Sequence, residues 1–435
     1  MDALTLARIQ FGISIGFHYL FPLTTLGMSL FIVIFEGIAF VKKADRFRVI
    51  SSFLIRIFAL IFTMGVATGI MMPFAVGGNW SRFAEFSGSI FGTAIAIEAI
   101  VAFAFESAFI AIVVFGRKKV SPFLYFACVV AVFAGAHFSA LLIVAVNSWM
   151  QTPAGFSLVN DKIVLVNFMA AIFNPSTVIR YVHVVTGAWL TGAFVIAGIG
   201  GYFYSRGRHP GEARLLLSIA LPLALALAVL QPMLGHEHIM NVLRNNPEKD
   251  AAYEGIFKTT RGAPLYMFGI PDAQNNTVRF AFGAPRALSF LESGDFHSTV
   301  RGLEEFPREN WPPVNAIFTT FHLMVLLGVI MIIASAAGVF LLYRKIAGAF
   351  VWERFLIFLV PVPYLANELG WIGTEVGRQP WVIYKVLHTA KASSMLIPSW
   401  QIATTLCGIC LLYACLLTLT VVFVRRTIKD GFDKE

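Results

Sequence analysis

Long apolar runs separated by polar gaps extend from the first residues of the chain to the last. A helix needs roughly 20 apolar residues to cross a hydrocarbon core of about 30 Å, and backbone groups in lipid must be paired within the segment. The pattern therefore predicts an all-α integral membrane protein of about nine transmembrane helices, near residues 11–39, 52–76, 90–116, 123–149, 181–205, 213–234, 316–343, 354–374 and 399–424.

The composition supports this fold class. The chain is 58% hydrophobic and only 13% charged, whereas soluble domains average about 25% charged residues. The net charge of +9 does not indicate nucleic acid, because the basic residues lie in short gaps between apolar runs. All four cysteines lie inside apolar runs, so we expect packing or lipid-facing residues and no disulfide framework (Cys128, Cys407, Cys410 and Cys415).

The distribution of basic residues predicts an orientation. Alternate gaps are rich in Lys and Arg, at 42–48, 117–119, 206–214 and 344–354, and the tail after 425 is basic too. The intervening short connections, such as 77–89, are poor in them. Because positive charge stays cytoplasmic, we expect the N-terminus outside and the C-terminus inside, which agrees with an odd number of spans.

One connection, residues 235–315, is long, polar and expected on the outer side. It keeps aromatic residues such as Tyr266 and Phe268, so we expect an ordered segment that lies partly in the membrane surface. The chain then divides into six helices over 1–234, this outer loop, and three helices over 316–435.

Ionisable side chains inside the spans are the first functional candidates, because each costs about 2.5–3.5 kcal/mol on insertion scales. They are His18, Glu98, Glu106, His137, His183, His322, Glu368 and Glu375.

The two glutamates of the third span are eight residues apart, which is about 800° of helix rotation and places both on one strip. This suits a proton relay or a neighbour of a metal or heme; the alternative is two protonated carboxyls bonded to backbone.

The histidines indicate an axial heme ligand or, individually, ordinary packing residues. Met324 adds a thioether in a later span, and His/Met is a known pair of heme ligands. The segment 370–381 closes the eighth span with Trp371, Glu375 and Arg378 on neighbouring turns. It is typical of an interfacial girdle, or of a carboxylate facing a prosthetic group whose acidic substituent binds the arginine.

Taken together, these residues resemble subunit I of cytochrome bd-type quinol oxidases, in the short-loop, often cyanide-insensitive branch. The matching motifs occur in order along almost the whole chain, and 370–381 is the most specific: Arg8-Ile-Gln-Phe-Gly with His18, Gly65-Val-Ala-Thr-Gly, Gly78-Asn-Trp-Ser-Arg-Phe, the Glu98/Glu106 helix, Asn147-Ser-Trp-Met-Gln-Thr-Pro, and Gly370-Trp…Glu375…Gly-Arg-Gln-Pro-Trp.

The resemblance implies heme ligands by position. His183 and Met324 match the axial ligands of a low-spin heme b (b558-type). His18 and Glu375 match those of two high-spin hemes, a heme b (b595-type) and a heme d or second heme b, without deciding which reduces oxygen. Glu98 lies beside one of them.

Further roles follow from the same resemblance. Trp371 corresponds to an aromatic between hemes, Arg378 to a propionate partner, and Arg8 to a cofactor-binding residue. Glu106, Ser139 and Asn147 resemble a proton route. The resemblance also implies a catalytic set of Glu98, Glu106, Glu375 and Trp371.

In the outer loop, Lys249 and Glu254 match residues that hydrogen-bond and deprotonate the quinol. One departure is His322, which stands where many members have Arg; it is a candidate propionate contact, quinol-site base or competing heme ligand.

The resemblance also implies the reaction and the partners. Ubiquinol or menaquinol would be oxidised at the outer face, and O2 reduced to water with cytoplasmic protons, in a bacterial inner membrane. Subunit II and membrane lipid are expected partners, and a small single-helix accessory subunit is left open. Two alternatives are a cofactor-free proton- or cation-coupled transporter using the intramembrane glutamates and a diheme electron-transfer cytochrome.

Overall fold

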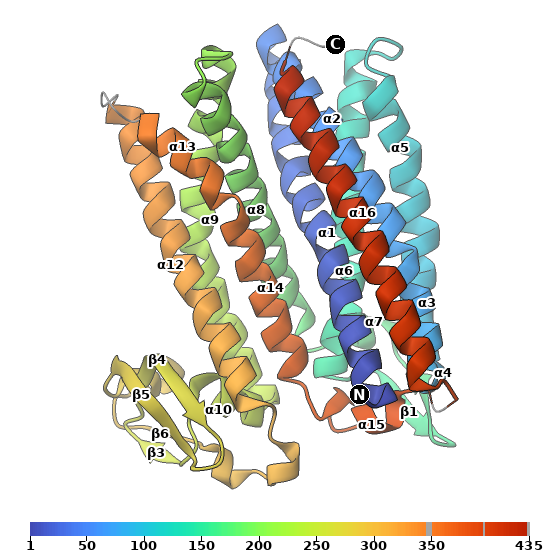
Figure 1. The fold of residues 1–435 in the computed structure, drawn as a ribbon, viewed down its shortest axis with the longest axis vertical. Helices are drawn as coiled ribbons and strands as arrows, with labels where there is room; N and C mark the ends of the chain where they lie inside the picture. Colours follow the sequence, from blue (N-terminus) through green and yellow to red (C-terminus); the bar gives the residue numbers. More distant parts are fainter. Residues whose placement is uncertain (345–349, 395, 433–435) are drawn as a thin grey trace.

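The computed structural model describes residues 1–344, 350–394 and 396–432. Within these ranges nine helical stretches are long and apolar enough to cross a membrane, which confirms the predicted all-α class and span number (Figure 1). The helices are α1 Ala3–Lys42, α2 Asp45–Gly69, α3 Met71–Asn79, α4 Ser81–Ile97, the π-helix Glu98–Phe103, α5 Ala104–Phe115, α6 Pro122–Gln151, α7 Phe168–Ile172, α8 Thr177–Ser205, α9 Pro210–Asn245, α10 Pro247–Glu254, α11 Ala287–Ser293, α12 Val314–Arg344, α13 Phe350–Leu359, α14 Pro361–Val376, α15 Thr389–Ala392 and α16 Ser399–Asp430.

Several helices run further than the apolar pattern predicts. The expected loop over 77–89 is wrong: α3 and α4 meet at Trp80 and continue the second and third spans beyond their apolar parts. The charged residues there are exposed, as the ion pair between Lys162 and Glu85 illustrates. Likewise α9 extends past residue 234 to Asn245. Polar residues therefore mark the end of the lipid-facing part of a helix, but they do not end the helix itself.

The spans form two groups. The helices α8, α9, α12 and α14 pack together on one side, and α1, α2, α6 and α16 lie on the other (Figure 1). The groups meet where α1 crosses α8 at Gly27 and Gly192, each of which faces the backbone of the other helix. Small residues permit this close approach of two helices in a membrane. This crossing joins the helix that carries His18 to the helix that carries His183.

The outer loop is ordered, as expected. It contains α10, α11 and two antiparallel pairs, β4 Leu265–Asp272 with β5 Thr277–Ala284, and β3 Thr260–Arg261 with β6 Thr299–Val300. This loop and the N-terminus lie at the same end of the bundle, and the C-terminus lies at the opposite end (Figure 1). Two further hairpins connect spans, β1 Phe156–Val159 with β2 Lys162–Leu165, and β7 Trp381–Ile383 with β8 Leu387–His388.

Basic gaps come together at the C-terminal end of the bundle. Arg46 pairs with Glu212, Arg56 donates to the carbonyl of Gly431, and Arg208 donates to the carbonyl of Lys429. These contacts join the α1–α2, α8–α9 and C-terminal segments. They agree with the sorting of these gaps to one side of the membrane that the sequence predicts.

Candidate functional site

Glu375, at the end of α14, is the centre of a polar network between the two helix groups. Its Oε1 accepts a hydrogen bond of 2.6 Å from Asn147 Nδ2 on α6. Its Oε2 accepts one of 2.5 Å from Arg378, which is only 5% exposed. Asn147 Oδ1 in turn accepts from Arg180 on α8. Each carboxylate oxygen keeps a lone pair, so the group is oriented and can still bind a cation.

Glu98 and Glu106 lie on the same span, but the connection between them is not a regular α-helix. The π-helix Glu98–Phe103 separates them, so the rotation of 100° per residue assumed from the sequence is wrong here. Single π-turns are frequent at functional sites. Glu98 Oε1 accepts a 2.9 Å bond from Ser139 on α6, whereas Glu106 is 7% exposed and its Oε1 has no partner among the described residues.

His18 lies on α1 where this helix faces α2 and α14. Its Nδ1 is 2.9 Å from Thr68 Oγ1 on α2. Two residues earlier, Gly16 faces the Glu368 carboxylate and the Trp371 ring on α14. The part of α1 that carries His18 therefore packs against α14 through Gly16, while the His18 ring itself contacts α2.

His183 on α8 faces α9 within the four-helix group. Its Nε2 is 3.3 Å from Gln231 Nε2, and its buried Nδ1 has no hydrogen-bond partner among the described residues. The His238 ring is 5.5 Å away between centroids. Met324 enters the same group from α12, where its sulfur faces Gly370 of α14.

Two other intramembrane histidines have both ring nitrogens engaged. His322 Nδ1 and Nε2 each lie 2.8 Å from a carbonyl oxygen, of Phe318 and Tyr266. This geometry leaves no ring nitrogen for iron and so opposes the competing-ligand interpretation of His322. His137 lies 2.7 Å from the Phe133 carbonyl and accepts from Trp189 Nε1. His137 is thus a packing residue.

The quinol-loop candidates lie on α10. Lys249 is 4% exposed and its Nζ donates two 3.0 Å bonds, to Gln151 Oε1 and to the Thr374 carbonyl. Burial and the nearby Arg180 hold the pKa of Lys249 well below its usual range. Because Thr374 directly precedes Glu375 in the chain, this amine connects α10 of the outer loop to the polar network around Glu375.

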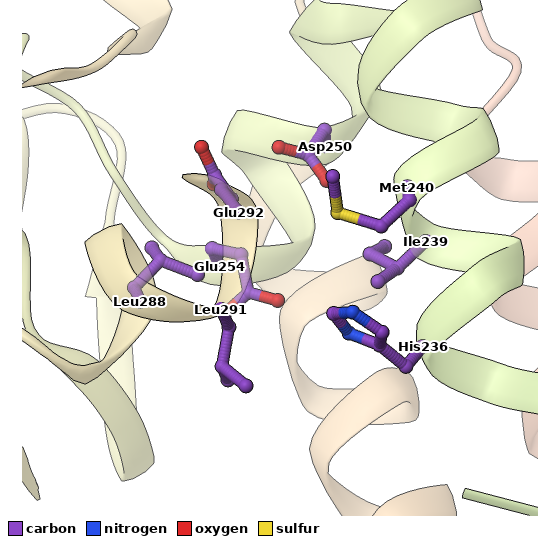
Figure 2. A pocket seen from close by; sticks show the side chains of 8 residues that line it. All are labelled: His236, Ile239, Met240, Asp250, Glu254, Leu288, Leu291 and Glu292. Atoms are coloured by element: carbon purple, nitrogen blue, oxygen red, sulfur yellow. The ribbon is translucent and has the colours of Figure 1, made fainter. Parts of the chain in front are cut away.

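Glu254 lines a cavity of about 40 Å³ to which Lys249 does not contribute (Figure 2). The cavity is lined by three elements: His236, Ile239 and Met240 of α9, Asp250 and Glu254 of α10, and Leu288, Leu291 and Glu292 of α11. Burial raises the pKa of Glu254 to about 8, with a further contribution from the charge of Glu292. The carboxyl is therefore a stronger base than an ordinary glutamate.

The donor set fits heme. A neutral imidazole, a thioether and a carboxylate are the side chains that ligate heme iron or lie near it, and His183, Met324 and Glu375 supply them inside the bundle. Among the described residues, Arg378 also has two buried nitrogens without partners, Nε and Nη1. Unpaired buried donors are costly, so a bound acidic group would relieve them.

One predicted cofactor-binding residue lies away from the buried networks described above. Arg8 is exposed near the start of α1. Sequence reasoning missed Arg180, Gln151, His238 and Glu292, which the fold adds to the networks above. Arg180 and His238 carried the available signal of an ionisable residue at the end of a span. Gln151 stands in the matching motif that begins at Asn147 but was given no role, and Glu292 lies in polar sequence and carried no signal.

Comparisons with known proteins agree with these features. Residues 6–432 match the family model described as cytochrome bd terminal oxidase subunit I. The chain is 32% identical to the cytochrome bd ubiquinol oxidase subunit 1 of Bacillus subtilis, over 100% of this chain and 95% of that protein. It is 27% identical to the cytochrome bd-II ubiquinol oxidase subunit 1 of Escherichia coli, over 99% and 97%. The solved bd oxidase of Geobacillus thermodenitrificans superposes with a TM-score of 0.91 at 27% identity, covering 99% of both chains.

Proposed function

The chain belongs to the cytochrome bd terminal oxidase subunit I family, and from this premise we propose how its residues couple quinol oxidation to oxygen reduction. The protein is a subunit of a quinol:oxygen oxidoreductase and a multi-pass protein of the bacterial inner membrane. This identity decides against both a cofactor-free transporter and a cytochrome that never meets oxygen.

His183 and Met324 would hold a low-spin heme b within the group formed by α8, α9, α12 and α14. His18 and Glu375 would hold the two high-spin hemes, one a heme b and the other a heme d or second heme b, with Glu98 beside one of them. When bound, these hemes supply electron transfer and oxygen reduction. The single observation that carries this assignment is the buried Nδ1 of His183, which has no hydrogen-bond partner in the described part of the chain and lies in the helix group that Met324 also enters.

Around these ligands the protein provides orientation. Asn147 and Arg378 hold the two oxygens of Glu375, and Thr68 orients the His18 ring. Trp371 would lie between the cofactors, and Arg378 would donate to a propionate through the two nitrogens that have no partner among the described residues. Arg8, and His322 through its ring edge, remain proposed contacts of the cofactor periphery.

Quinol, either ubiquinol or menaquinol, would bind at the outer face beside α10. Lys249 donates hydrogen bonds to a quinol oxygen, and Glu254 accepts the proton that leaves the hydroxyl. A general base works best when its pKa lies near the ambient pH, and that of Glu254 is about 8. The protons of quinol are thus released on the outer side.

Protons for water formation would enter from the cytoplasm. Glu106 and Glu98 supply carboxyls at different heights of the third span, and Ser139 joins Glu98 to α6. Asn147, two turns further along α6, reaches Glu375. Taking up protons on one side and releasing them on the other would generate a proton-motive force without pumping. Subunit II is the expected partner, and a small single-helix accessory subunit is a second candidate partner.

The test replaces His183 by Ala in the purified complex and compares it with His137→Ala. Both remove an imidazole from a span, but His137 has hydrogen-bond partners for both ring nitrogens. We expect the low-spin heme b band to vanish from the reduced-minus-oxidised spectrum of the first variant and to persist in the second. Persistence of the band in folded His183→Ala complex would refute the ligand assignment.

A further inference from the structure

The cavity beside α10 contains more acid groups than binding a quinol oxygen requires. Asp250 and Glu254 are 3% and 4% exposed, and Glu292 approaches them from α11, about 40 residues later in the chain (Figure 2). In the described part of the chain, Glu254 Oε2 and Glu292 Oε1 are buried atoms without a hydrogen-bond partner. A buried carboxyl oxygen without a hydrogen bond is costly, so this arrangement calls for a ligand that the described protein groups do not provide.

The size of the cavity identifies that ligand. Pockets for small organic molecules measure about 300–1,000 Å³, whereas this one measures about 40 Å³. A buried water needs roughly 10–15 Å³ and two or more polar partners, so the space suits about three waters. Ordered water between carboxyl groups is a conductor of protons.

The cavity also has a direction. Its inner wall is the buried pair Asp250 and Glu254, while Glu292 is half-buried and His236 and Leu291 are exposed. It therefore leads from the carboxyl proposed to act on quinol to the outer surface of the protein. Lys249 lies apart from it, bonded to Gln151 and Thr374.

We propose that Glu292 is the outlet of a proton relay in which a proton taken by Glu254 passes through water in this cavity to the Glu292 carboxylate. Asp250 is the second acid on the inner wall. The relay rests on the proposed role of Glu254 in quinol oxidation. In each turnover the quinol loses two electrons to the enzyme's own acceptors and two protons, each leaving as an O–H bond breaks. The proton joins a carboxylate oxygen of Glu254, then one of Glu292, and finally outer water.

Electrostatics are compatible with this transfer. Burial raises the pKa of Glu292 to about 7 and that of Glu254 to about 8. The pKa of Asp250 is raised well above its usual range by burial and by the other two carboxyls. The titratable groups facing the cavity are these three acids and His236 of α9. Burial raises both pKa values toward the ambient pH, so each carboxyl can take up and release a proton there.

The experiment measures the rate at which quinol reduces the hemes of the anaerobic, purified complex by stopped-flow absorbance between about pH 6 and 9. Glu292→Gln keeps the shape of the side chain but cannot carry a proton. Glu309→Gln is the matched control, because Glu309 is an exposed carboxyl of the same loop that does not line the cavity. We expect Glu292→Gln to slow heme reduction about 100-fold, the lower end of the range of about 10²–10⁴-fold for a lost proton-transfer group, and to change the pH profile.

Two further measurements separate a relay from a structural role. Glu292→Asp retains an acid and should recover most of the rate, and added sodium formate should accelerate Glu292→Gln but not the control. Equal rates and pH profiles for Glu292→Gln and Glu309→Gln would overturn the relay. If Glu254→Gln also reduced its hemes at the normal rate, the proposed quinol-site role itself would fail, whereas a slow Glu254→Gln with a normal Glu292→Gln removes only the relay.

Discussion

Gly27 lies at the crossing of α1 and α8, and replacing it by Ala tests whether this contact positions the cofactor ligands. A Cβ at residue 27 would lie 2.6 Å from the amide nitrogen and 2.7 Å from Cα of Gly192, and would also overlap the carbonyl of Ala188. All three are backbone atoms, so a side-chain rotation cannot relieve the overlap.

The magnitude follows from the geometry. Ordinary carbon–carbon contact is about 3.5 Å, so a distance of 2.7 Å requires α1 and α8 to separate by about 0.8 Å. Overpacking of this kind costs about 1–3 kcal/mol. Because α1 carries His18 and α8 carries His183, the separation also displaces two proposed heme ligands relative to each other.

The assay compares Gly27→Ala with Gly408→Ala, which adds the same methyl group to α16 where it meets open space. Both complexes are purified, their heme-to-protein ratio is measured, and their unfolding temperature is followed by scanning fluorimetry. We expect the unfolding temperature of Gly27→Ala to be several degrees lower than that of Gly408→Ala, and its heme-to-protein ratio to be lower as well. Equal heme content and equal unfolding temperature in the two variants would show that the crossing is not a tight backbone contact.

Two other predictions concern the outer loop. The pKa of Glu254 is about 8 in the folded protein, against an ordinary value of 4.5. The folded state therefore holds the proton more tightly than the unfolded state does. The resulting contribution to the free energy of unfolding is complete below about pH 4.5 and is lost as the pH rises through about 8. Amide hydrogen exchange of α10, corrected for its intrinsic pH dependence, should accordingly become faster between about pH 6 and 9, and unchanged protection would contradict the buried acid. Lys249→Met should raise the quinol KM about tenfold while the heme spectrum stays normal, because Lys249 donates to Gln151 and Thr374 rather than to a proposed ligand; a variant with unaltered KM would remove Lys249 from the quinol site.

Much of the candidate site could be found from sequence because the membrane makes ionisable residues expensive. Glu98, Glu106, His183 and Glu375 stand out in apolar runs for that reason alone. The argument fails outside the lipid, where charged residues are ordinary. Glu292 therefore carried no signal until the fold placed it against Glu254.

The sequence by itself determined the fold class, the number of spans and the clustering of basic gaps at one end, because the hydrophobic thickness of a bilayer acts on each segment separately. Only the tertiary structure decided where helices end, as at Trp80 and Asn245. Outside the lipid, polar residues are as compatible with a continuing helix as with a loop. It also decided that Glu375 meets Asn147, that both ring nitrogens of His322 face carbonyls, and that α10 and α11 share a cavity. Such pairings depend on which faces of distant helices meet, and no local pattern of residues encodes that choice.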